Sequence, residues 1–248
     1  KCQNIQLILE KEYIIENIFS LLNCIAFIGL RSIEIITKYK NNYDYTLITK
    51  QYKNISFIYL YSAPKNEFLK SHVLGLQQIF SSINDFEITY DKSLEFFNVN
   101  ITLFTESQKH NTYFNSKLHI DTNGAIKNAP LAKTVFGNVH NLTNPDEILA
   151  IINTKEFQKY WHVHKGLIDV CKQCEFRHMC VDNRIPKQRS NNEWYMETEC
   201  NYNPYIAKWN NEDGYKSLSE CGVVSNQAGF KINRKKISEI NKVIWGDE

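Results

Sequence analysis

The chain has few glycines, few prolines and no long uninterrupted apolar run. Its 248 residues include 9 glycines and 5 prolines, and no Gly-rich loop follows a strand-like run. A Rossmann or P-loop nucleotide site therefore has no support. Because Glu16, Asn17 and Asn23 interrupt the densest apolar stretch, no run reaches the roughly 18 residues that a membrane span needs.

The chain also lacks an excess of charge and a secretory leader. Its 29 basic and 27 acidic residues give a formal net charge of +2, so we expect neither nucleic acid nor a membrane surface as a partner. We expect no signal peptide and a cytoplasmic protein. It begins at Lys1 rather than at methionine, so we expect a fragment of a longer protein.

Cysteine is scarce as well, but four of the 7 cysteines are clustered. Cys171, Cys174 and Cys180 have the spacing C-x2-C-x5-C, and Cys200 follows after a longer segment. Four thiolates can ligate an iron–sulfur cubane or a structural zinc ion. A disulfide scaffold is typical of short secreted chains and is disfavoured here. The spacing predicts a metal centre, of iron–sulfur or zinc type.

Other residues near these cysteines have more ordinary interpretations. The neighbouring histidines are His162, His164 and His178, and the neighbouring cations are Lys172, Arg177 and Arg184. Histidine ligands would favour zinc, but four thiols already complete a tetrahedral shell, so we expect packing or surface histidines. His178 is also placed to donate a hydrogen bond to a cluster sulfur. We expect packing thiols at the three isolated cysteines, Cys2, Cys24 and Cys221.

The first part of the chain alternates strand-like and helix-like segments. Runs rich in β-branched residues predict strands over 5–9, 32–37, 55–61 and 86–90. Apolar residues at helical spacing predict helices over 14–22, 43–52 and 73–80. This alternation predicts parallel βα units, in a barrel or an open sheet.

The pattern changes from about residue 98. Asn123-Gly124 between alternating apolar residues predicts a hairpin over 117–127. Asn144 as a cap and Pro145 in the first turn predict a helix that continues to Ile152. We expect a second short helix carrying Phe157 and Trp161, a polar irregular segment over 181–199, and a tail helix from Asn233 with Ile237, Ile240 and Ile244 on one face.

Five segments carry a family resemblance. They are NSKLHI at 115–120, GAIKNAP at 124–130, FGNV at 136–139, CKQCEFR at 171–177 and CNYNPY at 200–205. In this order they resemble the SPASM domain, a cluster-binding extension that follows the barrel of radical SAM peptide-modifying enzymes. More narrowly, the chain looks like the SPASM-domain peptide maturase of grasp-with-spasm systems.

The resemblance implies a fold and a ligand set. Residues 1–97 would form a partial (βα) barrel of radical SAM type, 98–209 a SPASM-like iron–sulfur domain, and 210–248 a C-terminal extension with the tail helix. One [4Fe–4S] cluster would be held by Cys171, Cys174, Cys180 and Cys200, with structural zinc as the alternative. The family's second auxiliary cluster would be lost, because its ligand places here read Tyr113, Ala129 and Asn183 or Arg184.

The resemblance also implies a function. The chain would be a peptide maturase that acts with an ATP-grasp ligase on a ribosomally made precursor peptide. The C-x3-C-x2-C triad of radical SAM enzymes is absent from the sequence, so S-adenosylmethionine is not supported and enzymatic activity stays open. The alternative is a non-catalytic protein, stabilised by zinc or a cluster, that recognises the precursor and presents it to the ligase.

Overall fold

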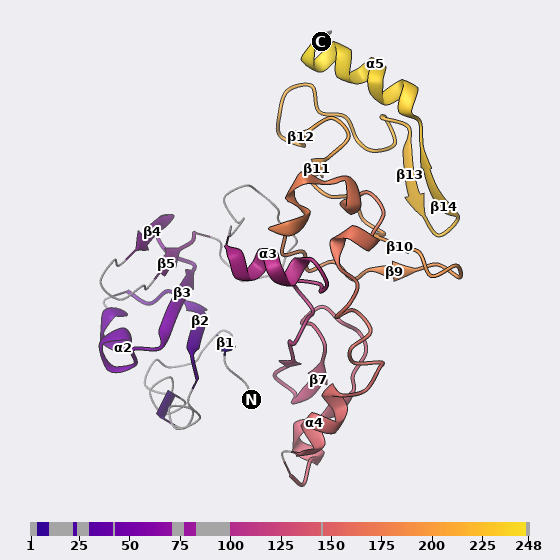
Figure 1. Cartoon of the computed structure of the whole chain (residues 1–248). Coiled ribbons are helices and arrows are strands. Elements are labelled where there is room, and N and C mark those ends of the chain that lie inside the picture. The colour runs from indigo at the N-terminus through magenta and orange to yellow at the C-terminus, as the bar shows by residue number, and fades with distance from the viewer. Residues whose placement is uncertain are drawn as a thin grey trace. The chain divides into compact units, whose positions relative to one another are not determined.

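The computed structural model describes residues 4–9, 22–23, 30–41, 43–70, 77–82, 100–144 and 146–246. The chain forms two compact units, Lys1–Glu87 and Ile88–Glu248, which are drawn from indigo to yellow along the sequence (Figure 1). The strand predicted over 86–90 and residues 14–21 of the first predicted helix lie outside the described residues.

The first unit is built on a five-stranded sheet with the order β1-β2-β3-β5-β4. Its strands are β1 (Asn4–Ile8), β2 (Ser32–Lys38), β3 (Ile55–Tyr61), β4 (Glu67–Lys70) and β5 (Gln77–Phe80). The first three strands and β5 are parallel neighbours, whereas β4 pairs with β5 in the antiparallel sense. The short helix α2 (Thr46–Gln51) connects β2 to β3.

The central strands consist of apolar runs because the side chains on both of their faces are buried. Ile33 and Ile35 of β2 and Ile58 and Leu60 of β3 are almost completely buried, and Ile48 of α2 packs with them. Parallel strands that are covered on both faces read as continuous apolar runs. The predictions of strands over 5–9, 32–37 and 55–61 and of a helix within 43–52 are therefore confirmed.

The barrel prediction is wrong. The described strands form an open sheet with β1 and β4 at its edges, and residues 77–80, expected to be helical, are strand β5. A parallel neighbour needs a long crossover, whereas an antiparallel neighbour is reached by a short connection. Because β4 and β5 pair in the antiparallel sense, the βα alternation that a barrel requires ends at this pair.

The second unit starts with α3 (Ile101–Ser107) and a three-stranded sheet of β6 (His119–Ile120), β7 (Ala125–Lys127) and β8 (Gly137–Asn138). The predicted hairpin joins β6 to β7. Asp121 Oδ1 accepts hydrogen bonds from the amides of Asn123 and Ala125. Gly124 has a φ of +78°, and a Cβ there would lie 2.8 Å from His140 Cδ2. The turn therefore requires glycine at this position.

Helix α4 (Asp146–Ile152) confirms the prediction made from its cap. Asn144 Oδ1 accepts from the amide of Asp146, and Glu147 Oε1 accepts from the amide of Thr143. These bonds satisfy amides that a helix start leaves open. The short helix expected around Phe157 is instead a series of turns, in which the buried Phe157 ring packs edge-on against Phe136 at 4.9 Å.

The chain ends in a hairpin and a helix. Strands β13 (Val223–Asn226) and β14 (Gly229–Ile232) pair, and α5 (Arg234–Trp245) follows, shown in yellow in Figure 1. Asn233 Oδ1 accepts from the amide of Lys236, so the predicted tail helix is confirmed together with its cap. The apolar face of α5 packs on one small core, whose members are Ile206, Leu218, Cys221, Val223, Ile237, Ile240 and Ile244.

None of the helices among the described residues has both the length and the apolar character needed to cross a membrane.

Candidate metal centre

Three successive 3-10 turns lie before and along the C-x2-C-x5-C segment: Cys171 begins the second, Cys174 lies between the second and the third, and Cys180 follows the third. The turns are η3 (Lys165–Leu167), η4 (Cys171–Gln173) and η5 (Glu175–His178). The Cys174 amide donates to the Cys171 carbonyl at 3.0 Å, and the Arg177 amide donates to the Cys174 carbonyl at 3.2 Å. The short C-x2-C spacing therefore folds into tight turns that keep Cys171 and Cys174 on one compact stretch of backbone.

The backbone is strained immediately before the first cysteine. Val170 has a φ of +64° and a ψ of −56°, and the Cys171 amide donates to the Asp169 carbonyl at 2.7 Å. This is a γ-turn with positive φ, a conformation that is rare and costly for a β-branched residue. Such strain persists only where the surrounding contacts hold it in place.

A buried ion pair provides that support. Asp169 is 3% exposed, and its carboxylate accepts from Arg189 Nη1 at 2.7 Å and from Lys172 Nζ at 3.1 Å. Arg189 also donates to the carbonyls of Asn226 and Gly229, in the hairpin of β13 and β14. The strained turn is thereby tied to the C-terminal hairpin.

Aromatic side chains bring the segment after Cys200 against the cysteine turns. The ring of Phe176 in η5 lies 4.9 Å from that of Tyr202 and 6.0 Å from that of Trp209. Tyr202 also donates a hydrogen bond to Glu175. Tyr202 lies in β11 (Tyr202–Asn203), which pairs with β12 (Lys208–Trp209). Cys200 therefore enters the site two residues ahead of a strand that is packed on η5.

The four thiols share one electrostatic neighbourhood. Burial raises the pKa of Cys171, which also feels the charge of Cys200, while Lys165 opposes the rise. Burial likewise raises the pKa of Cys174, which interacts with Cys171 and Cys180, and a hydrogen bond from the Phe176 amide opposes that rise. Because burial raises the pKa of Cys171 and of Cys174, metal ligation by these two thiols would release protons.

A fully buried cation lies beside these thiols. Lys165 Nζ donates to Asp182 Oδ2 at 2.6 Å, and Arg184 Nη2 donates to the same oxygen at 2.7 Å. Burial alone would lower the pKa of Lys165, but Asp182 and then Cys171 and Cys180 outweigh it and raise that pKa. Burial would raise the pKa of Asp182, but the two cations hold it far below its ordinary value. This region therefore carries positive charge that can compensate bound thiolates.

The donor set fits a four-cysteine metal centre in its chemistry. Thiolates are the ligands of iron–sulfur clusters and of many structural zinc sites, and the Phe176 amide gives Cys174 a hydrogen bond of the kind that tunes a ligating sulfur. In the described part of the chain, however, no three Cys, His, Asp or Glu side chains converge closely enough to hold a metal ion.

The neighbouring histidines all have structural contacts. Nδ1 of His178 lies 3.0 Å from Ser107 Oγ and 3.1 Å from Gln108 Nε2, at the end of α3. Burial lowers the pKa of His178, and the charge of Arg177 lowers it further. The His162 ring lies 5.0 Å from that of His110, and His164 Nδ1 accepts from the Gly166 amide. These contacts agree with the expectation of packing histidines.

The neighbouring cations Lys172, Arg177 and Arg184 all contact other groups of the protein. Arg177 Nη1 donates to the Cys174 carbonyl at 3.1 Å, Arg184 binds Asp182, and Lys172 lies 4.7 Å from the centre of the Phe230 ring. Cys221 is completely buried and accepts from Asn203 Nδ2 at 3.3 Å, which confirms it as a packing thiol. Cys2 and Cys24 lie outside the described residues.

Two of the residues expected at the ligand places of a second cluster, Tyr113 and Ala129, lie in apolar surroundings. Tyr113 and Ala129 belong to one apolar cluster, whose other members are Phe114, Ala132, Tyr160, Trp161 and Ile185. Thr112 Oγ1 donates to the Cys180 carbonyl at 2.8 Å, which places this cluster beside the segment that contains Asn183. Burial, with a contribution from Asp182, raises the pKa of Tyr113 to about 12. Tyr113 and Ala129 are therefore packed side chains, and the loss of a second cluster stays a prediction.

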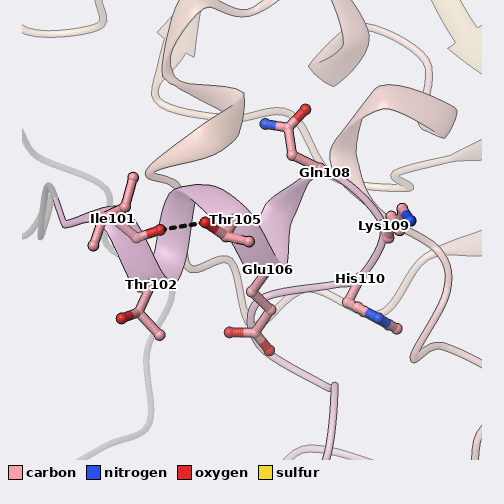
Figure 2. A pocket seen from close by; sticks show the side chains of 7 residues that line it. All are labelled: Ile101, Thr102, Thr105, Glu106, Gln108, Lys109 and His110. Atoms are coloured by element: carbon pink, nitrogen blue, oxygen red, sulfur yellow. Dashed lines mark hydrogen bonds between the residues drawn. The ribbon is translucent and has the colours of Figure 1, made fainter.

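A hollow of about 760 Å³ lies along α3 (Figure 2). Its described lining comes from one short stretch, with Ile101, Thr105, Glu106 and Gln108 among the residues drawn. Thr105 Oγ1 donates back to the Ile101 carbonyl, at 2.7 Å, rather than outward. Groups from a single helix do not converge on a ligand from several sides, so we assign no site there.

The sequence reasoning missed the buried charges. The sequence does not single out Lys165, Asp169 or Asp182, and it indicates Arg184 as a neighbouring cation or as the place of a lost ligand, not as a buried ion-pair partner. No local pattern marks a charged residue for burial, since charged side chains are almost never fully buried unless they are paired. The expectation of an irregular segment over 181–199 is wrong in part, because β9 (Lys187–Gln188) and β10 (Trp194–Tyr195) pair within it. The sequence signal for the buried charges is the small number of apolar residues in that segment, which requires another source of stability.

No family model, curated protein or solved structure matches the chain.

Proposed function

We propose that the chain is a cluster-binding component of peptide maturation, with one [4Fe–4S] cluster held by Cys171, Cys174, Cys180 and Cys200. The observation that carries the proposal is the C-x2-C-x5-C segment folded into tight turns that buried ion pairs brace, with the strand after Cys200 packed on those turns through Tyr202 and Phe176. The four thiols are partly exposed, and a metal centre accounts for their clustering in the sequence better than core packing does.

Iron–sulfur is preferred to zinc because of the resemblance to SPASM domains. A bound cluster would supply electron transfer or a substrate-binding surface. The protein's own contribution is clearer: the Phe176 amide is placed to bond the Cys174 sulfur, and the buried Lys165 offsets thiolate charge. Both features support a thiolate-ligated centre of either kind.

The partners follow from the same resemblance. We propose a ribosomally made precursor peptide as the substrate or ligand and an ATP-grasp ligase as the partner enzyme, in the cytoplasm. Thiol ligation suits that reducing compartment, and no disulfide joins two of the described cysteines.

A second candidate is a non-catalytic recognition protein in which the metal only stabilises the fold. The observation that favours it is the edge strand β4, where Phe68 is 57% exposed and Leu69 is 45% exposed. An exposed edge can take up an extended peptide through main-chain hydrogen bonds, with apolar side chains adding affinity. The open sheet of the first unit is suited to this role.

Metal analysis of anaerobically purified protein tests the main proposal. We expect a brown protein with about four irons and equivalent sulfide per chain, the content of a single cubane. Colourless protein that holds one zinc after reconstitution with iron and sulfide would favour the recognition protein. Calorimetry with the precursor peptide, with and without the ligase, tests the partners, and absence of binding in both experiments would remove them.

A further inference from the structure

A second cavity lies between the cysteine turns and the C-terminal helix. Its volume is about 380 Å³, within the range of small-ligand sites. Residues from four parts of the second unit line it: Gln173 of η4, Tyr205, Ile232 of β14, and Arg234, Ile237, Ser238 and Asn241 of α5. Unlike the hollow along α3, this cavity receives groups from several elements.

The cavity wall is held rigidly. Asn241 Nδ2 donates to the Tyr205 carbonyl at 2.9 Å, and Trp245 Nε1 donates to the Ile206 carbonyl at 3.0 Å. Ile237 also packs in the core beneath α5. These contacts fix α5 against the loop that contains Tyr205, so a ligand would meet a preformed surface.

The lining combines apolar walls with one cation. Ile232 and Ile237 are partly buried and aliphatic, Ser238 and Gln173 are polar, and Arg234 is the one charged residue among the described lining. A guanidinium presents a planar fork that matches a carboxylate through two parallel hydrogen bonds. The complementary ligand is therefore a carboxylate with an apolar stem.

The charges at the start of α5 add to the positive field beside the cavity. The first turn reads Arg234-Lys235-Lys236 and contains no acidic residue. The N-terminus of a helix carries partial positive charge, so cations there are unfavourable and anions are favourable. Glu220 offsets part of the charge of Lys236, and Arg234 is the cation of this turn that lines the cavity.

We propose that this cavity binds the carboxylate of a peptide, with Arg234 as the anion-binding residue and Ile232 and Ile237 as the contacts for its apolar stem. The carboxylate belongs either to an acidic side chain or to the peptide's C-terminus. That the ligand is a peptide rests on the proposed function; that the cavity accepts a carboxylate does not.

The test is a titration of the full, metal-loaded chain followed by amide chemical shifts at Ser238 and Asn241. The probes are N-acetyl-leucine for a terminal carboxylate and N-acetyl-glutamate α-amide for a side-chain carboxylate. N-acetyl-leucinamide lacks the charge, and inorganic phosphate lacks the apolar stem. We expect at least one carboxylate probe to bind, and the stronger of the two identifies the source.

The variant Arg234→Gln and its control Lys235→Gln distinguish direct binding by Arg234 from the general effect of positive charge at the start of α5. Both remove one charge from the same helical turn, but only Arg234 lines the cavity. Loss of a charge-assisted hydrogen bond weakens binding about tenfold or more in Arg234→Gln, against about twofold in Lys235→Gln. Equal losses, no carboxylate binding, or equal binding of leucinamide or phosphate would overturn the proposal. Metal content measured on the same samples keeps this outcome separate from failure of the proposed function.

Discussion

Lys165 donates to Asp182 across 2.6 Å in an interior where the lysine side chain is 5% exposed and the aspartate is fully buried. The two residues lie on opposite sides of the C-x2-C-x5-C stretch, since Lys165 precedes Cys171 and Asp182 follows Cys180. The pair therefore closes the cysteine segment on itself without a metal. Metal ligation and this ion pair would be two separate constraints on the same loop.

Breaking the pair should destabilise the second unit. In Lys165→Met the Asp182 carboxylate keeps Arg184 but loses its other buried cation. Removing one partner of a buried pair costs about 3 kcal/mol or more, measurable as a fall in the free energy of unfolding in urea. The control is Lys187→Met, whose pair with Glu197 is exposed and spans 3.7 Å. It should cost less than about 1 kcal/mol, and equal costs would show that burial does not strengthen the first pair.

Acid should weaken the fold through Asp182. Burial opposes its ionisation, but Lys165 and Arg184 hold the folded-state pKa far below the ordinary value. A depressed folded pKa gives stability that is fully present above the unfolded pKa of about 4 and is lost as the pH falls below it. The free energy of unfolding should therefore decline from about pH 4 downwards, and Asp182→Asn should flatten that decline. An unchanged acid slope in Asp182→Asn would assign the acid sensitivity to other carboxylates.

Much of the fold was predictable where one local signal dominates. The runs at 32–37 and 55–61 are rich in β-branched residues, and Asn123-Gly124 leaves few alternatives to a hairpin turn. The helix from Asn233 has both a cap and a stripe of isoleucines. Each of these elements is found in the structure because propensity and periodicity agree.

The failures have a common physical cause. The run Gln77–Phe80 is too short for periodicity to separate helix from strand, and its pairing with β4 decides the outcome. Similarly, the distance of 17 residues between Lys165 and Asp182 hides their contact from any local pattern. The cysteine spacing suggests ligands, but the charged residues that brace the turns depend on tertiary contacts.

The fourth ligand can be tested by a pair of cysteine variants. Cys200 shares the electrostatic neighbourhood of Cys171, whereas Cys221 is fully buried with a hydrogen bond from Asn203. Cys200→Ala should lose the metal and expose residues 181–199 to proteolysis, because ligation contributes to the order of its surroundings. Cys221→Ala should retain the metal. Equal metal loss in the two variants would mean that Cys200 is not the fourth ligand.

The last prediction concerns a hydroxyl in the core beside the cysteine turns. The Tyr205 hydroxyl oxygen is buried and has no hydrogen-bond partner among the described residues. Burial, followed by the charge of Asp169, raises its pKa to about 12, so the group stays protonated and its desolvation is uncompensated. Removing a buried, unsatisfied polar group is stabilising, so Tyr205→Phe should raise the free energy of unfolding by about 1 kcal/mol.

Tyr195 provides a control of opposite sign for this substitution. Its hydroxyl donates to Gln227 Oε1 at 2.8 Å, and Tyr195→Phe removes that hydrogen bond while leaving the Gln227 oxygen without it. That variant should lower the free energy of unfolding by about 1 kcal/mol. Urea denaturation of both variants under identical conditions compares the two signs directly. If Tyr205→Phe is destabilising as well, the Tyr205 hydroxyl makes a hydrogen bond in solution, and its buried position beside Asp169 and Cys171 is not a net cost to stability.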